Sequence, residues 1–240
     1  MDMRKEALSY IVGMKDPKIV EAFGEQYSDK PLIRVDKELR AAPLKMKTLT
    51  SLIDYINAGI DSTKGNMIVH VVAPDCVKLV SCLDTDRQRE TLVEVHAEIP
   101  DFSYGSFMDH ETFLISLQAK FLPGNDRDLL LKFAGTVENG TVAQYGDDGV
   151  SQKATIKTGI ASKADYVVPN PVLLTPYRTF MEVEQPESSF IFRLKDDERI
   201  GVRCAIFEAD GGAWKNAAME RVAEFIREQL HGREGFTVIY

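Results

Sequence analysis

Hydrophobic residues recur at helical spacing in several stretches of the chain. The clearest stretch follows Thr48, and its apolar positions are Leu49, Leu52, Ile53 and Ile56. Residues 57–59 then supply a stop that ends in glycine. A second stretch opens at Asp109, a residue type that favours helix N-caps, and its stripe consists of Phe113, Leu114, Leu117 and Phe121. The spacing predicts helices over both stretches, and residues 126–135 are expected to resume a helix after the break "PGND".

The N-terminal stretch has a shorter pattern of the same kind. Residues 6–14, "EALSYIVGM", predict a short helix that closes near Pro17. Residues 18–23, "KIVEAF", are expected to add another helical turn before Gly24.

In other stretches, apolar and polar residues alternate or apolar residues follow one another without a break, and both patterns are typical of strands. Residues 67–72, 76–83 and 92–99 read "MIVHVV", "CVKLVSCL" and "LVEVHAEI". In the last of these, Val93 and Val95 share one face while Glu94 and His96 share the other, which predicts a half-buried strand in an antiparallel hairpin. Residues 141–145 and 153–160, joined by "GDDG", predict a second hairpin.

The C-terminal third predicts a three-stranded antiparallel meander. Its expected strands are "RTFMEVE", "FIFRL" and "IGVRCAIFEA", at residues 178–184, 190–194 and 200–209. A helix after Asp210-Gly211-Gly212 is expected to cover this sheet with a stripe formed by Trp214, Ala218, Val222, Phe225 and Ile226. We therefore predict an α+β fold of antiparallel hairpins and a C-terminal meander covered by helices. Residues 1–165 form a helical and hairpin region and residues 166–240 the meander with its helix, with one continuous domain as the alternative.

Composition narrows the range of functions. The chain has 240 residues, a formal net charge of -8 and a sequence pI near 5.1. This acidic balance argues against broad attraction to nucleic-acid phosphates, although it leaves room for a local basic groove. Three cysteines without framework spacing suit a reducing compartment, and neither a signal peptide nor a membrane-spanning apolar run of roughly 20 residues is apparent. We expect a cytoplasmic protein that does not enter a membrane.

Three motifs in the C-terminal third carry a resemblance to a known family. They are Pro176-Tyr177-Arg178-Thr179-Phe180, Glu184-Gln185-Pro186 and Asp210-Gly211-Gly212-Ala213-Trp214. Over residues 166–230 the chain resembles the YfdQ-like family of phage- and prophage-encoded proteins, which has no assigned biochemical activity. The resemblance implies a phage or prophage accessory protein in a bacterial cytoplasm, and it brings no catalytic residues with it.

Residues that could bind a metal are present but poorly spaced. Cys76, Cys82, His70 and His96 could approach one another on neighbouring strands. However, Cys76 and Cys82 are six positions apart, which is about 20 Å along a strand. We therefore interpret both as buried structural thiols, and we predict neither a metal nor a cofactor.

Other catalytic patterns are incomplete. His96-Ala97-Glu98 resembles half of a deaminase signature, but no P-C-x-x-C follows, so an exposed strand face is favoured. "HETFL" has leucine where a zincin needs its second histidine. Asp84 and Asp86 fit a turn better than a magnesium site, and "GDDGVSQKATIKTG" lacks the G-K-[ST] of a phosphate loop. Because each of these motifs is incomplete, we predict that the protein is not an enzyme.

Two groups of residues are candidates for binding. Tyr177 and Arg178 lie in a proline-framed corner that could present an aromatic face and a guanidinium to a carboxylate, a phosphate or a base. Trp214 could contact a ligand, and Lys153, Lys157 and Lys163, with Tyr166 beside them, form the one cluster suited to nucleic acid. The alternatives are structural: Arg178 would pair with Glu182 or Glu184, and Trp214 would anchor its helix to the sheet.

Three classes of function remain. We favour a non-catalytic accessory protein that acts by binding and by homo-oligomeric assembly, with a phage or host protein as a further partner. The first alternative is an accessory to DNA recombination that binds single-stranded DNA, and the second is a metal-dependent enzyme. The N-terminal helix, bounded by Pro17 and Gly24, is expected to take part in assembly.

Overall fold

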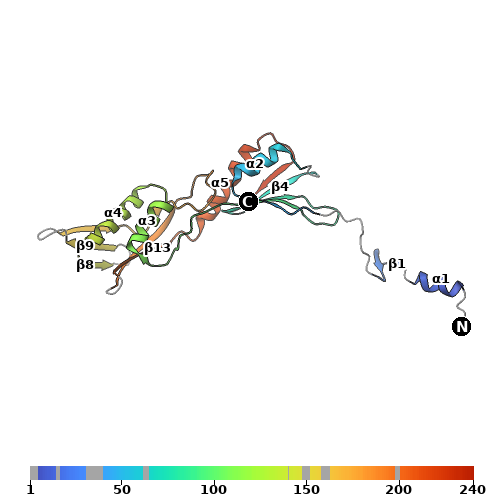
Figure 1. Cartoon of the computed structure of the whole chain (residues 1–240), viewed down its shortest axis with the longest axis horizontal. Coiled ribbons are helices and arrows are strands. Elements are labelled where there is room, and N and C mark those ends of the chain that lie inside the picture. Colours follow the sequence, from blue (N-terminus) through green and yellow to red (C-terminus); the bar gives the residue numbers. More distant parts are fainter. Residues whose placement is uncertain are drawn as a thin grey trace. The chain divides into compact units, whose positions relative to one another are not determined.

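The computed structural model describes residues 5–14, 17–30, 40–61, 65–139, 141–147, 152–157, 163–197 and 201–240 (Figure 1). Its contacts divide the chain into two units, Met1–Arg40 and Ala41–Tyr240. The helices and strands confirm the predicted α+β fold class. Among the described helices, none combines the length and the apolar character needed to cross a bilayer.

The first unit contains one helix and one hairpin. Helix α1, Lys5–Gly13, confirms the predicted N-terminal helix. Strands β1, Ile19–Ala22, and β2, Glu25–Ser28, pair antiparallel, so the expected helical turn over residues 18–23 is wrong. The β-branched pair Ile19 and Val20 favours an extended chain, and Gly24 permits the tight reversal that joins the two strands.

The second unit contains two apolar cores, and the first is built on a five-stranded sheet of order β14-β4-β5-β6-β3. Its elements are β3 Leu44–Met46, α2 Leu49–Ala58, β4 Met67–Ala73, β5 Cys76–Ser81, β6 Thr91–His96, α5 Ala213–Gln229 and β14 Phe236–Ile239. Strands β4, β5 and β6 form the predicted antiparallel hairpins, with Val93 and Val95 buried and His96 exposed. The edge strands β14 and β3 pair in parallel with β4 and β6.

Helix α2 begins and ends as its sequence predicts. The Thr48 hydroxyl accepts a hydrogen bond from the backbone N–H of Ser51 at 3.2 Å, which caps the N-terminus. Gly59 adopts the left-handed conformation at the C-terminus, with φ of 56°. The apolar stripe of the helix is buried in the first core.

The second core lies on a four-stranded sheet of order β11-β12-β13-β7. Its elements are β7 Met108–Asp109, α3 His110–Lys120, α4 Asn125–Asn139, β11 Val172–Leu174, β12 Ser188–Asp197 and β13 Gly201–Glu208. Asp109 caps α3 by accepting the N–H of Thr112 at 2.9 Å, as predicted. Buried aromatic rings dominate this core, namely Phe113, Phe121, Phe133, Phe190 and Phe192.

A third sheet has the order β10-β9-β8 and consists of β8 Thr141–Asp147, β9 Gln152–Lys157 and β10 Lys163–Val168. Pairing of β8 with β9 confirms the predicted hairpin, although part of its expected turn lies outside the described residues. Strand β10 was not predicted.

Two details of the predicted meander are wrong. Its first strand is β11, whereas residues 178–187 form an irregular loop, because Gln185 binds the backbone groups of this loop from within. The C-terminal helix α5 buries Val222 and Ile226 in the first core, against β4 and β14, and does not cover the meander. Residues of α3 and α4 pack on the meander instead.

Candidate functional site

The loop between β11 and β12 is held in place by the side chain of Gln185. Its Oε1 accepts hydrogen bonds from the backbone N–H groups of Arg178, at 2.9 Å, and Thr179, at 3.1 Å. Its Nε2 donates to the carbonyl oxygens of Phe180, at 2.9 Å, and Val183, at 3.3 Å. The Gln185 side chain is buried, so these contacts satisfy groups that water cannot reach. The Pro-Tyr-Arg corner is therefore rigidly positioned.

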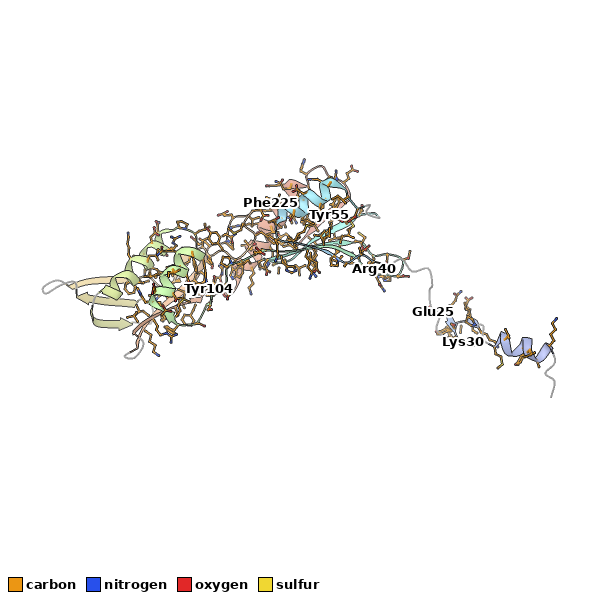
Figure 2. The ribbon with its side chains drawn as sticks, in the orientation of Figure 1. Glu25, Lys30, Arg40, Tyr55, Tyr104 and Phe225 are labelled. Carbon is orange, nitrogen blue, oxygen red and sulfur yellow. The ribbon has the colours of Figure 1, made fainter. Side chains whose placement is uncertain are left out.

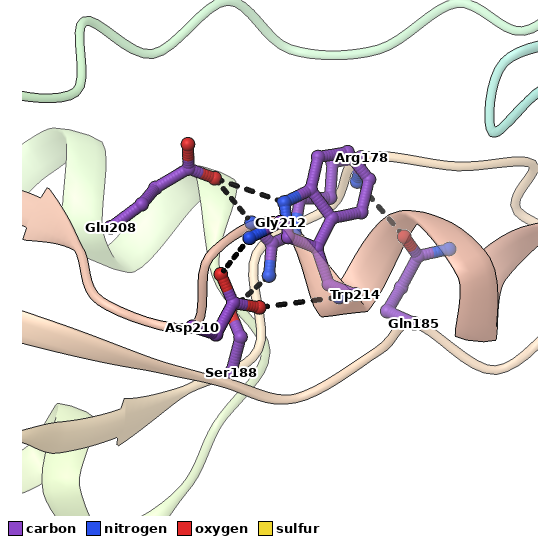
Figure 3. Close-up of polar contacts among 7 residues, drawn as sticks. All are labelled: Arg178, Gln185, Ser188, Glu208, Asp210, Gly212 and Trp214. Atoms are coloured by element: carbon purple, nitrogen blue, oxygen red, sulfur yellow. Dashed lines mark hydrogen bonds and ion pairs between the residues drawn. The ribbon is translucent and has the colours of Figure 1, made fainter.

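Arg178 is buried although it carries a charge, with 5% of its surface exposed. Its Nη1 donates to Glu208 Oε1 at 2.8 Å, and its Nη2 donates to the hydroxyl of Ser188 (Figure 3). The guanidinium carbon lies 4.0 Å from the ring centre of Trp214, in a cation–π contact. Burial lowers the pKa of Arg178, and the nearby Tyr104 and Glu208 act in the opposite direction.

Trp214 is positioned by the turn that starts α5. Gly212 has φ of 83°, and Asp210 accepts hydrogen bonds from the backbone N–H groups of Gly212, at 3.0 Å, and Trp214, at 3.2 Å. The indole Nε1 of Trp214 donates to Glu208 Oε1 at 3.1 Å. The same carboxylate oxygen therefore accepts from both Arg178 and Trp214, which fixes the indole ring over the guanidinium (Figure 3).

This cluster borders a groove of the second unit with a cavity volume of about 780 Å³. The groove is lined by the β4–β5 turn, by residues 99–102 and Tyr104, by Tyr177, Arg178 and Glu208, and by residues 214–216 and 219 of α5. Phe102 and Tyr104 contact each other with ring centres 4.8 Å apart. Burial raises the pKa of Tyr104 to about 12. The walls thus combine aromatic rings with charged groups of both signs.

The predicted structural partners of Arg178 were wrong, because its ion pair is with Glu208. Glu182 instead accepts the N–H of Thr50 at 3.2 Å, and Glu184 lies 4.0 Å from Arg221. Sequence proximity suggested Glu182 and Glu184, whereas the partner is Glu208, the last residue of β13 and thirty positions away along the chain. Its position in "FEADGGAW", directly before the Asp210 turn, was the available signal.

Tyr177, Arg178 and Trp214 are brought together at the groove, whereas the lysine cluster lies on a different sheet. The register pairs Lys163 with Lys157 and Val167 with Lys153, so positions 153, 157 and 163 share one face of the β9–β10 pair. Tyr166 pairs with Ala154, which puts position 166 on the other face.

The candidate metal ligands are partly separated. Cys76 and His96 are cross-strand partners, with Sγ and Nε2 3.9 Å apart, and burial raises the pKa of the Cys76 thiol. The expectation that Cys82 is buried is wrong, because β5 ends at Ser81 and leaves Cys82 exposed. His70 pairs with Lys78 in the β4–β5 register. In the described ranges of the chain, no group of three or more His, Cys, Asp or Glu residues is arranged to hold a metal ion.

The aspartates of the D-x-D pattern and the start of "HETFL" have local contacts. Asp84 accepts the N–H of Gln88 at 2.8 Å through its carboxylate, which confirms the predicted turn role. His110 is buried at the start of α3, and its Nε2 lies 2.7 Å from the carbonyl oxygen of Ala134.

Comparison of the chain with protein-family models, with curated proteins and with solved structures found no match. From its own structure, the molecule is an α+β protein with a surface groove lined by aromatic side chains.

Proposed function

We propose that this chain is a non-catalytic binding protein that acts as a homo-oligomer. The observation that supports the proposal is the surface of the first unit. Its exposed large apolar side chains are Leu8, Tyr10, Val12, Met14, Ile19, Val20, Phe23 and Tyr27. Within this unit, no residue whose burial the structure describes is buried. Figure 2 draws side chains of this unit as sticks, with Glu25 and Lys30 labelled.

Such a segment gains little stability from its own contacts. An isolated two-stranded hairpin is marginal in water, and a single short helix is marginal as well. Both gain stability when their apolar side chains are covered by another surface. In a homo-oligomer, a second copy of the chain supplies that surface. An apolar N-terminal unit therefore fits a role in self-association better than a role in a monomer.

The proposed setting rests on the sequence motifs of the YfdQ-like resemblance. It is that of a phage or prophage accessory protein in the cytoplasm of a bacterial host, where a phage or host protein is a further partner. The rigid groove beside Arg178 is a suitable place for such binding, because aromatic walls with a few fixed polar groups are typical of recognition sites.

The experiment is light scattering coupled to size exclusion at micromolar concentration, on the full-length chain and on a variant lacking residues 1–24. We expect an oligomer for the full-length chain and a smaller species for the deletion, with unchanged circular dichroism from the second unit. A full-length mass equal to the 26.9 kDa of one chain would reject the proposal. An unchanged oligomer after deletion would reject the role of the N-terminal unit.

One observation favours the DNA-binding alternative. Positions 153, 157 and 163, which are all lysines, share a face of the β9–β10 pair in a chain whose formal net charge is -8. Position 166, the tyrosine of the same predicted cluster, falls on the opposite face. Binding of a fluorescent single-stranded oligonucleotide at several salt concentrations tests this alternative. Affinity that falls steeply with salt, and that is lost when all three lysines are changed to glutamine, would favour it.

A further inference from the structure

The groove beside Arg178 is lined by two Pro-Asp pairs from neighbouring segments of the chain. Pro74-Asp75 forms the turn between β4 and β5, and Pro100-Asp101 follows β6. The backbone N–H of Ala97 donates to the carbonyl oxygen of Asp75 at 2.9 Å, so the turn lies beside the segment that leaves β6. Both aspartates are exposed. One side of the groove therefore carries two carboxylates.

These two carboxylates have no partner within the described part of the chain, where neither Asp75 nor Asp101 forms a side-chain hydrogen bond or an ion pair. Lys120 donates to the backbone carbonyl oxygen of Asp101 and not to its carboxylate. An ionised carboxylate only accepts hydrogen bonds, so both groups are suited to a ligand that donates them.

The positive groups of the groove do not balance these carboxylates. Arg178 is buried, and its charge is offset by Glu208, with Nη1 and Oε1 2.8 Å apart. Lys215 is exposed, and its Nζ lies 5.9 Å from the ring centre of Trp214. Apart from the Arg178–Glu208 pair, the lining has two carboxylates and one ammonium group. The formal net charge of -8 also attracts cations, so the groove favours a cationic ligand.

The aromatic lining favours a guanidinium over an ammonium group. The rings of Phe102, Tyr104 and Tyr177 are half-buried and line the groove. A guanidinium stacks on aromatic rings and forms paired hydrogen bonds with a carboxylate, whereas an ammonium group is a compact and strongly hydrated charge. The protein already contains one such contact, because the guanidinium carbon of Arg178 lies 4.0 Å from the ring centre of Trp214.

Hydrogen bonds hold the sides of the groove together. The Thr179 hydroxyl donates to the carbonyl oxygen of Pro74 at 2.5 Å, which joins the β11–β12 loop to the β4–β5 turn. Gln185 fixes the same loop from within. A groove held in this way needs little ordering when a ligand binds, which favours affinity. Its volume of about 780 Å³ lies within the range of roughly 300–1,000 Å³ that is usual for binding pockets.

We propose that this groove binds an arginine within an otherwise apolar peptide segment of a partner protein. The guanidinium is bound by Asp75 and Asp101 beside the aromatic rings, and the flanking apolar residues pack on Ile99 and Met219. Arginine is a residue type that often dominates the energetics of protein interfaces. The inference rests on the proposed role of the chain as a binding protein, and it names the chemistry of the partner.

Trp214 is the chain's single tryptophan and lines the groove, so its fluorescence reports on binding there. The probe is the acetylated and amidated pentapeptide Ala-Leu-Arg-Leu-Ala, titrated into the full-length chain to millimolar concentration at low salt. We expect a saturable change in Trp214 emission and an affinity that falls as salt is added. A peptide with citrulline, the uncharged isostere of arginine, should bind about tenfold more weakly, and one with glutamate more weakly still.

Substitutions of the two aspartates test the site itself. Asp75→Asn and Asp101→Asn, made separately, should each weaken binding of the arginine peptide about two- to fivefold and leave binding of the citrulline peptide unchanged. Asp54→Asn is the matched control, because it makes the same change at an exposed position of α2 outside the groove. Equal weakening by all three substitutions would indicate a general charge effect and overturn the assigned contact.

The outcomes separate this inference from the proposed function. Calorimetry with the same peptides detects binding that leaves Trp214 emission unchanged. If the chain is oligomeric but the arginine peptide gives neither signal, or binds no better than the citrulline peptide, the groove assignment fails while homo-oligomeric function stands. If the chain is monomeric but binds the arginine peptide through Asp75 and Asp101, homo-oligomeric function fails and the groove assignment stands.

Discussion

Replacing Gln185 with methionine should strongly destabilise the second unit. Methionine has a similar volume, so the substitution removes hydrogen bonds with little change in packing. The Gln185 side chain accepts from two backbone N–H groups and donates to two carbonyl oxygens. The residues carrying those N–H groups are buried, Arg178 at 5% and Thr179 at 1% exposure, so water cannot take the place of the amide.

The magnitude follows from the groups left without partners. A buried donor that loses its acceptor costs about 1–3 kcal/mol. Two such donors give a loss of about 2–6 kcal/mol in the free energy of unfolding, a large fraction of the stability of a typical domain. The loop also positions Arg178 beneath Trp214, so the tryptophan emission of the folded variant should shift as well.

Urea denaturation followed by circular dichroism and by Trp214 fluorescence measures this loss. The control is Glu187→Met, which introduces the same side chain two positions away at an exposed site and should change stability by no more than about 0.5 kcal/mol. A Gln185→Met variant as stable as this control, with the native emission spectrum, would refute the assigned role of the amide.

Three further predictions concern other parts of the second unit. Truncation before Ala213 should make the chain insoluble, because it removes both α5 and the edge strand β14 and exposes the apolar residues of the first core; a soluble truncation that melts cooperatively would contradict this. Burial raises the pKa of Cys204 to about 12, so iodoacetamide at mildly alkaline pH should modify the exposed Cys82 and reach Cys204 only after unfolding, as mass spectrometry can follow. Burial also raises the pKa of Tyr104 from 10.0 to about 12, so the unfolded chain loses the Tyr104 proton at a lower pH than the folded chain does. The free energy of unfolding should therefore fall as the pH rises from about 10 to about 12, and denaturant titrations at several pH values can test this.

Metal analysis tests one more prediction. We expect no stoichiometric zinc in protein purified without a tag and without chelator, since Cys82 is exposed beyond the end of β5 while Cys76 is buried with His96. One zinc per chain would contradict this expectation.

Local patterns predicted the elements that depend on local interactions. Helix α2 has both an apolar stripe and end signals, at Thr48 and Gly59, so its bounds could be predicted closely. The β4–β5–β6 hairpins could be predicted because short runs of apolar or alternating residues are separated by polar turns. In both cases the residues that decide the structure are neighbours along the chain.

Features that depend on distant pairing could not be predicted in this way. The stripe of α5 indicates that Val222 and Ile226 are buried, but it does not indicate which of two sheets buries them. The parallel strand β14 joins the sheet only because β4, more than 160 positions earlier, offers a free edge. Likewise Arg178, in the loop between β11 and β12, pairs with Glu208 at the end of β13, thirty positions away.

The central claim is that self-association covers the apolar side chains of the first unit. Hydrogen exchange, measured by mass spectrometry at a low and a high protein concentration, tests this claim most directly. We predict that exchange in residues 17–30 slows as the concentration rises, while the buried strands β4 and β5 exchange at the same rate throughout. Exchange in residues 17–30 that is equally fast at both concentrations would contradict the claim.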